Sequence, residues 1–250
     1  MIDWVICCGM PRSGSTLQYQ VVTHLVEARG IGQGIGFFDR AHFEVAESEY
    51  IPGQIKVVKC HEYIPRALEL AEEGRAVGVY SQRDMRDVVV SVMNQSNKSF
   101  SEVASRSRLR NLVEQSHSWK KMSPLLVSRY ENLYRKLDVE IRRIAEFLKL
   151  RVSESEIEEL VTTYSISTQK KRILEISSQN LSPSGFGGYD PKSQLHQGHI
   201  QSAKLDRWKT ELSKMQAAYI ECYLGQWLLS EQYEISQNVL MRFLARFIYR

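Results

Sequence analysis

The chain has 250 residues, 43% of them apolar, which is enough for one α/β domain with a sizeable core, and no linker-like stretch divides it. Its formal net charge of +4 is small and scattered, so we expect an anionic small ligand and no nucleic-acid partner. The four cysteines lack the spacing of a metal site, so we expect reduced thiols, no disulfide, no zinc and a cytoplasmic protein without a signal peptide.

The first sixteen residues predict a buried strand that ends in an anion-binding loop. Residues 4–8 form the short apolar run that is typical of a parallel strand. Gly9 and Gly14 then have the G-x-x-x-x-G spacing that lets backbone N–H groups surround an anion. Ser15 and Thr16 open a helix whose positive end faces the same place. We expect a phosphate or sulfate ligand here, and the competing interpretation is a glycine turn without a ligand.

The loop departs from that of a nucleotide triphosphatase. Such a loop has a lysine after the second glycine, which reaches the outer phosphates, and then a hydroxyl residue that holds magnesium. Ser15 occupies the lysine position, and the nearest cation is Arg12, whose planar guanidinium can bind two oxygens at once. The sequence therefore argues against ordinary ATP chemistry, and we expect no metal.

Residues 11–16, PRSGST, resemble the loop P-[KR]-S-G-[ST]-T of the sulfotransferase family at every position. The donor of that family is 3′-phosphoadenosine 5′-phosphosulfate (PAPS), and the product is 3′-phosphoadenosine 5′-phosphate (PAP). The resemblance implies that the donor's 5′ end is bound by Arg12, Ser13, Gly14, Ser15, Thr16 and Leu17.

The segment from Ile31 to Gly53 is glycine-rich and aromatic, and it is long for a connector. We expect either a functional loop or lid that lines the acceptor pocket, or aromatic side chains that cover the sheet edge. A second buried strand is predicted over Ile55 to Cys60. The aromatic group of this segment comprises Phe37, Phe38, His42, Phe43 and Tyr50.

Lys59 and His61 lie two residues apart at the end of this strand, so extended backbone would point both side chains to the same side. Strand ends are where α/β folds place chemistry, although a lone histidine there is more often structural. The pair resembles the family's K-T-H motif, with Cys60 in place of threonine. The resemblance implies that His61 is the general base and that Lys59 and Arg12 stabilise developing charge.

A third strand over Ala76 to Ser81 leads to Arg83 and Ser91, which can hold a second phosphate from a strand end and the following helix. The family uses an arginine and a serine at this spacing for the donor's 3′-phosphate, so the resemblance assigns Arg83 and Ser91 to it. Neighbouring acids are expected to cap the helix and to pair with Arg86; these are Asp84 and Asp87.

Ser99 and Glu102 predict a capping box for a helix that reaches Met122, and residues 124–129 predict a fourth strand. Tyr130 follows in YENL, which resembles the family's Y-E-D-L. It either contacts the adenine of the donor or fills the core with its hydroxyl satisfied.

The segment from Leu181 to Ile200 is rich in glycine, proline and histidine, as expected of a mobile loop. The family closes such a loop over the donor with R-K-G-x-x-G-x-W-[KR], of which only residues 208–209 match. The missing positive charge would come from Lys204, or from His196 and His199.

Asp206 is expected to cap a long helix that continues to about Glu231. Residues 235–250 then form an amphipathic pattern with three arginines, which is too short and too charged to span a bilayer. It suits either an interfacial membrane helix or a helix docked on this subunit or on a dimer mate.

Together these segments predict a single three-layer α/β/α domain over residues 1–250, with a central parallel sheet of four or five strands. We expect sulfuryl transfer from PAPS to a hydroxyl or amine of a small-molecule, lipid or carbohydrate acceptor. The alternatives are an ATP-dependent phosphotransferase with a degenerate loop, and a PAPS-binding protein that docks at the membrane without turnover.

Overall fold

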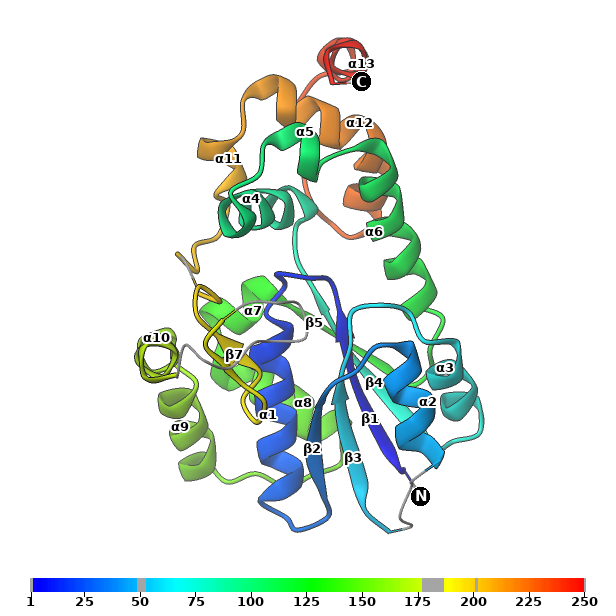
Figure 1. Ribbon diagram of the computed structural model, residues 1–250, viewed down its shortest axis with the longest axis vertical. Coiled ribbons are helices and arrows are strands. Elements are labelled where there is room, and N and C mark those ends of the chain that lie inside the picture. Colours follow the sequence, from blue (N-terminus) through cyan, green and yellow to red (C-terminus); the bar gives the residue numbers. More distant parts are fainter. Residues whose placement is uncertain (1, 49–52, 177–186, 201, 250) are drawn as a thin grey trace. The chain divides into compact units, whose positions relative to one another are not determined.

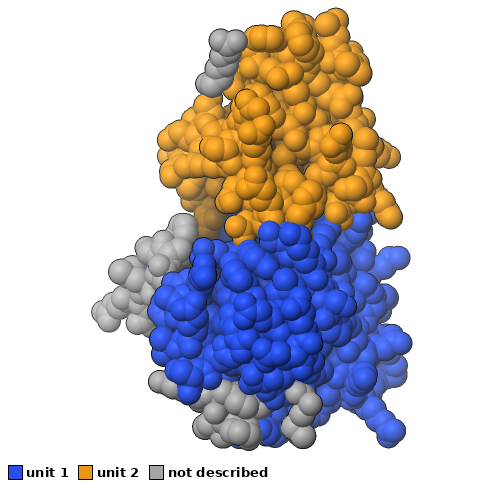
Figure 2. Space-filling view, turned by 90° about the vertical axis from the view of Figure 1, so that its right-hand side faces the viewer, with its two compact units in different colours: residues 1–82, 118–203 blue, residues 83–117, 204–250 orange. Residues whose placement is uncertain are grey.

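The computed structural model describes residues 2–48, 53–176, 187–200 and 202–249. The chain divides into two compact units (Figure 2), each built from two stretches of sequence. Unit 1 comprises residues 1–82 and 118–203, and unit 2 comprises residues 83–117 and 204–250. The expectation that the whole chain is a single domain stays a prediction.

Unit 1 contains a five-stranded parallel sheet with the strand order β2-β3-β1-β4-β5. The central strand β1 is buried along its whole length because it pairs on both sides, with Ile6 opposite Val58 of β3 and Gly78 of β4. The predicted α/β class with a central parallel sheet is confirmed. The strands are β1 (Trp4–Gly9), β2 (Gly32–Phe37), β3 (Ile55–Lys59), β4 (Ala76–Gln82) and β5 (Leu125–Arg129).

Helices cover both faces of this sheet (Figure 1). On one face Val5 and Cys7 of β1 pack in a core with residues of α1, α8 and α9. On the other face Trp4 lies 4.9 Å, between ring centroids, from Phe43 of α2. The helices of this unit are α1 (Ser15–Glu27), α2 (Arg40–Ser48), α3 (Pro65–Glu72), α7 (Tyr130–Arg135), α8 (Leu137–Phe147), α9 (Glu154–Thr163) and α10 (Ile166–Glu175).

The expectation that the segment from Ile31 to Gly53 is a loop is wrong, because β2 and α2 occupy it, and its role in lining the acceptor pocket stays a prediction. Strand β2 was not predicted because glycines, which give no apolar pattern, occupy positions where close packing leaves no room for a side chain. A Cβ on Gly32 would lie 2.0 Å from the Ile55 carbonyl oxygen, and one on Gly34 would lie 2.6 Å from Tyr19 Oη. The predicted second strand is therefore the third, β3. Phe43 is fully buried against Trp4 of the central strand rather than at the sheet edge, and Tyr50 lies outside the described residues.

Unit 2 is helical in its described part. The predicted capping box of Ser99 and Glu102 is confirmed, but the helix that it starts ends at Val103 rather than at Met122. The expected cap by Asp206 is wrong: α12 begins after a capping box of Ser213 and Gln216. The helices of this part are α4 (Met85–Ser96), α5 (Phe100–Val103), α6 (Arg106–Trp119, whose last two residues belong to unit 1), α11 (Trp208–Glu211), α12 (Lys214–Ser230) and α13 (Val239–Ile248).

The predicted mobile loop over Leu181 to Ile200 is described only from residue 187. That part forms a short antiparallel pair, β6 (Tyr189–Asp190) and β7 (Leu195–His196), so it is not irregular throughout. Gln20 of α1 anchors it by donating a 2.7 Å hydrogen bond to the Ser193 carbonyl oxygen.

Candidate active site

The loop between β1 and α1 is pressed against β4. A Cβ on Gly9 would lie 2.2 Å from Ser81 Oγ, so this position requires glycine. Arg12 and Gly14 both have positive φ angles, 64° and 81°, which turn the loop back toward the start of α1. The lack of space for a Cβ at Gly9 and the positive φ at Gly14 therefore explain why both positions of the motif are glycine.

Ser13 holds the loop in place with its side chain. Its buried hydroxyl donates a hydrogen bond to the Met10 carbonyl oxygen at 2.5 Å, and it lies 2.6 Å from Ser81 Oγ on β4. The hydroxyl of Ser13 is therefore directed into the protein, and its backbone N–H is the group that remains for a ligand.

The N-terminus of α1 provides donors for an anion. The first bond of the helix runs from the Gln18 N–H to the Gly14 carbonyl oxygen, so helix geometry leaves the N–H groups of residues 15–17 without an acceptor within the helix. The first turn, all of it in the described part of the chain, carries no acidic side chain. Leu17 is partly buried against the core of unit 1. This terminus is suited to a phosphate or a sulfate.

Lys59, the last residue of β3, contacts the start of α1. Its ammonium donates a 2.8 Å hydrogen bond to Thr16 Oγ1, and the residue is only 6% exposed. Burial lowers the pKa of Lys59 to about 8, and the charge of Arg12 lowers it further. An anion bound at the loop would offset both effects and favour the charged ammonium.

His61 lies two residues beyond β3, and its Nδ1 is 2.9 Å from the Gly9 carbonyl oxygen. Since a carbonyl can only accept, the neutral ring carries its proton on Nδ1 and leaves Nε2 as an acceptor. Burial lowers the pKa of His61 to about 4, and the charge of Lys59 contributes, so the ring is neutral at pH 7. The geometry gives His61 the tautomer that a general base requires.

Arg12 donates a 2.8 Å hydrogen bond from Nη2 to the His199 carbonyl oxygen. This contact links the loop to the segment that follows β7. Burial lowers the pKa of both His196 and His199, so both rings stay neutral at pH 7. In this structure, the cations of this part of the site are therefore Arg12 and Lys59, and the expectation that these histidines supply positive charge stays a prediction.

Tyr130, the first residue of α7, lies beside the loop. Its ring would be 3.0 Å from a Cβ on Gly14, and it stacks on Tyr134 with ring centroids 6.3 Å apart. A contact between Tyr130 and adenine stays a prediction. Unit 1 thus brings together nine of the predicted residues, namely Arg12, Ser13, Gly14, Ser15, Thr16, Leu17, Lys59, His61 and Tyr130.

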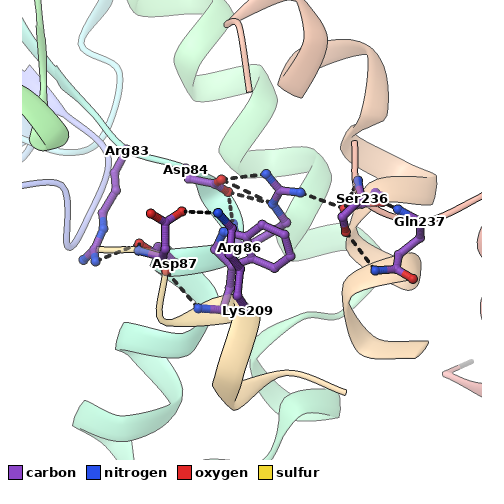
Figure 3. A network of polar contacts seen from close by, with 10 residues as sticks. Arg83, Asp84, Arg86, Asp87, Lys209, Ser236 and Gln237 are labelled. Carbon is purple, nitrogen blue, oxygen red and sulfur yellow. Dashed lines mark hydrogen bonds and ion pairs between the residues drawn. The ribbon is translucent and has the colours of Figure 1, made fainter. Parts of the chain in front are cut away.

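The remaining predicted residues belong to unit 2. Arg83 donates from Nη2 to Asp87 Oδ2 at 3.1 Å (Figure 3). It also donates from Nη2 to the Lys204 carbonyl oxygen at 2.9 Å. Asp87 therefore pairs with Arg83 and not with Arg86 as expected. Asp84 does cap α4 and pairs with Arg86, as predicted. Ser91 lies farther along α4 and is buried.

A buried charge network, which sequence reasoning missed, supports this arrangement (Figure 3). Arg86 donates to Glu221 Oε1 at 2.7 Å and lies 3.8 Å above the ring of Trp208. Asp87 accepts a hydrogen bond from the Trp208 N–H at 3.0 Å, so the network joins α4, α11 and α12. The residue that could have indicated this network is Glu221, because it is a carboxylate on the buried side of α12.

Solved structures of low sequence identity share this fold. Retinol dehydratase with androsterone and the inactive cofactor PAP aligns with a TM-score of 0.65 at 18% identity, over 94% of this chain and 82% of that one. The same protein with retinol and PAP gives 0.65 at 17%, over 95% and 84%. A mouse sulfotransferase complexed with PAP gives 0.61 at 14%, over 98% and 89%. At these identities the likeness establishes the fold alone.

The sequence itself establishes the family. The family model described as Sulfotransferase domain matches residues 3–230, which include the loop, the strand ends and the segment around Trp208. No curated protein sequence matches the chain significantly. By the extent of the domain match, the chain belongs to the sulfotransferase family.

Proposed function

We propose that this protein transfers a sulfuryl group from PAPS to a hydroxyl or amine of an acceptor. The proposal rests on the groups that lie together at one edge of the sheet. These are the N-terminus of α1, the cations Arg12 and Lys59, and the neutral ring of His61 with Nε2 as an acceptor. These are the parts that sulfuryl transfer needs, namely an anion cradle, charge stabilisation and a base.

The residues of the loop fit the 5′ end of PAPS. A phosphosulfate is anionic, and this loop presents backbone N–H groups, the guanidinium of Arg12 and the ammonium of Lys59. The family resemblance assigns the 3′-phosphate to Arg83 and Ser91, with Lys204 beside them, and the adenine to Tyr130.

The proposed mechanism assigns one task to each of three side chains. PAPS supplies an activated sulfuryl group, which leaves the phosphate oxygen as the acceptor oxygen or nitrogen attacks sulfur. His61 accepts the acceptor's proton at Nε2, because Nδ1 is committed to Gly9. Lys59 and Arg12 stabilise the negative charge that develops on the bridging oxygen.

For the acceptor we propose a small molecule, lipid or carbohydrate. The ring of Phe37 lies 5.7 Å from that of His61, between centroids, so an apolar surface borders the base. Androsterone and retinol are bound by the similar retinol dehydratase, and a ring or chain of that kind would suit such a border. For α13 the sequence left open a membrane surface, this subunit or a second copy of the chain as its partner.

Donor binding and turnover can be tested in two successive experiments. PAPS, PAP and ATP with magnesium are compared by thermal shift, and PAPS consumption is then followed with a panel of alcohols, amines, sterols and sugars. We expect PAP and PAPS to raise the melting temperature, ATP with magnesium to have little effect, and an acceptor to be sulfated. Stronger stabilisation by ATP with magnesium would indicate the phosphotransferase alternative. Tight PAPS binding without consumption would indicate the protein without turnover.

A further inference from the structure

Helix α13 exposes its apolar side. Six of its ten residues are large apolar side chains that are each between 47% and 73% exposed. In a globular protein an amphipathic helix normally turns this side toward the core. The six residues, which we call the apolar face of α13, are Val239, Leu240, Phe243, Leu244, Phe247 and Ile248.

The opposite side of α13 is the one that packs on the protein. Ala245 is fully buried, and the guanidinium of Arg242 lies over Gly225 of α12, 3.4 Å from where a Cβ would stand. The contact between α12 and α13 therefore uses a small residue and an arginine guanidinium. Since α13 is already seated by this side, its apolar face is available to something outside the unit.

A pocket of about 600 Å³ lies beside this helix in unit 2. Its base consists of Phe100, Tyr219 and Tyr249, whose ring centroids lie 4.9 to 5.9 Å apart. Phe243 and Phe247 belong both to its wall and to the apolar face of α13, so the pocket and the face are continuous.

The charges around the pocket are positive. Arg106 and Arg246 both line it, and neither forms an ion pair with any other residue in the described ranges. From residue 235 onward the sequence has three arginines and no acidic residue. Cations beside aromatic and aliphatic side chains are the composition of surfaces that bind anionic lipids.

We infer that α13 docks on the surface of an anionic lipid membrane, with the apolar face inserted among the acyl chains and Arg106 and Arg246 at the lipid phosphates. The ten-residue helix is roughly 15 Å long, about half the thickness of a bilayer core, so it lies on the membrane. No helix in the part of the chain that the structure describes is long and apolar enough to cross one.

A second copy of the chain suits this surface less well. Stable protein interfaces use roughly 20 to 30 residues on each side, and the apolar face has six. A two-fold contact through α13 would also bring the arginines of both copies together, at a cost in electrostatic energy. The membrane inference does not depend on the proposed sulfuryl transfer.

The test is flotation of the full chain with vesicles of phosphatidylcholine alone or mixed with phosphatidylserine. We expect the protein to bind only to the anionic vesicles. High salt should weaken this binding, because salt screens the attraction between the arginines and the lipid phosphates. The double variant Phe243→Ser, Phe247→Ser should bind roughly tenfold or more weakly, and Arg246→Glu about tenfold more weakly. Matched controls are Leu174→Ser, an 83% exposed apolar side chain of unit 1, and Arg110→Glu on the exposed side of α6; both should bind normally.

Three results would overturn the inference. These are equal binding to both kinds of vesicle, unchanged binding by the double phenylalanine variant, and a concentration-dependent dimer in ultracentrifugation that the same variant abolishes. If the double variant melts below the wild type, the pair Val239→Ser, Leu240→Ser replaces it, because these side chains are 73% and 65% exposed and lie outside the pocket.

Discussion

The ring of His61 is fixed by the carbonyl oxygen of Gly9, 2.9 Å from Nδ1. His61 follows β3 and Gly9 ends β1, two strands that pair directly in the sheet. One hydrogen bond therefore positions the candidate base against the residue where the anion loop begins. It also selects the tautomer, since the bonded nitrogen must carry the proton.

Substitution His61→Asn should lower kcat by roughly 10²- to 10⁴-fold, because general-base catalysis contributes that much. PAP affinity, measured by calorimetry, should change little, since the donor is bound by the loop. His117→Asn is the matched control on the exposed side of α6 and should retain full activity. Undiminished turnover by the His61 variant would remove this residue from the mechanism.

The pH profile of kcat/KM should be bell-shaped. Activity should fall as the pH drops toward about 4, because His61 is then protonated and cannot accept a proton. It should also fall above about pH 8, where Lys59 loses its proton and its charge. An acid limb near the usual histidine value, with no alkaline limb near 8, would contradict the assignment.

The two limbs can be separated experimentally. Bound donor adds negative charge beside Lys59, so the alkaline limb of kcat should lie at higher pH than that of kcat/KM. In Lys59→Arg the alkaline limb should vanish from the measured range, because a guanidinium stays charged. The acid limb should remain where it was in the wild type.

The positions of the candidate residues at the strand ends were predictable from the sequence because the arrangement is local. Gly9 to Thr16 form one continuous segment from the end of β1 to the start of α1, and Lys59 and His61 lie two residues apart at the end of one strand, so spacing alone places them. The pairing of Asp87 was not predictable in this way. Arg83 lies four residues before Asp87 but outside α4, and Arg86 is the adjacent residue, so the outcome depends on tertiary contacts: the Trp208 N–H binds Asp87, and Glu221 binds Arg86.

Strand β2 is an element that the sequence pattern did not predict. Its sequence, GQGIGF, has almost no apolar alternation, because a side chain at Gly32 would collide with Ile55 of β3 and one at Gly34 would collide with Tyr19 and Thr23 of α1. Pattern reasoning detects strands by the side chains that they bury. A strand held by close backbone packing therefore looks like a loop.

The contact between Ser13 and Ser81 should couple loop geometry to donor binding. Ser13→Ala and Ser81→Ala should each cost about 1 to 2 kcal/mol in the free energy of unfolding, since each removes a partner of a buried hydroxyl. The double variant should cost less than the two single costs added together. Both single variants should weaken PAP binding, whereas Ser101→Ala, on an exposed part of α5, should not. Strict additivity in denaturant unfolding would show that the two hydroxyls act independently.

Arg83→Ala should separate two donors that differ only in the 3′-phosphate. Loss of a charge-assisted contact should weaken PAPS roughly 10- to 100-fold and leave adenosine 5′-phosphosulfate nearly unchanged in competition binding. Arg83 also holds Asp87 and the Lys204 carbonyl, so a purely structural role would weaken both ligands together. Arg83→Lys, which keeps the charge but loses the fork, should lie between the wild type and Arg83→Ala for PAPS. Arg110→Ala is the exposed control, and equal losses for the two donors would overturn the assignment of Arg83 to the 3′-phosphate.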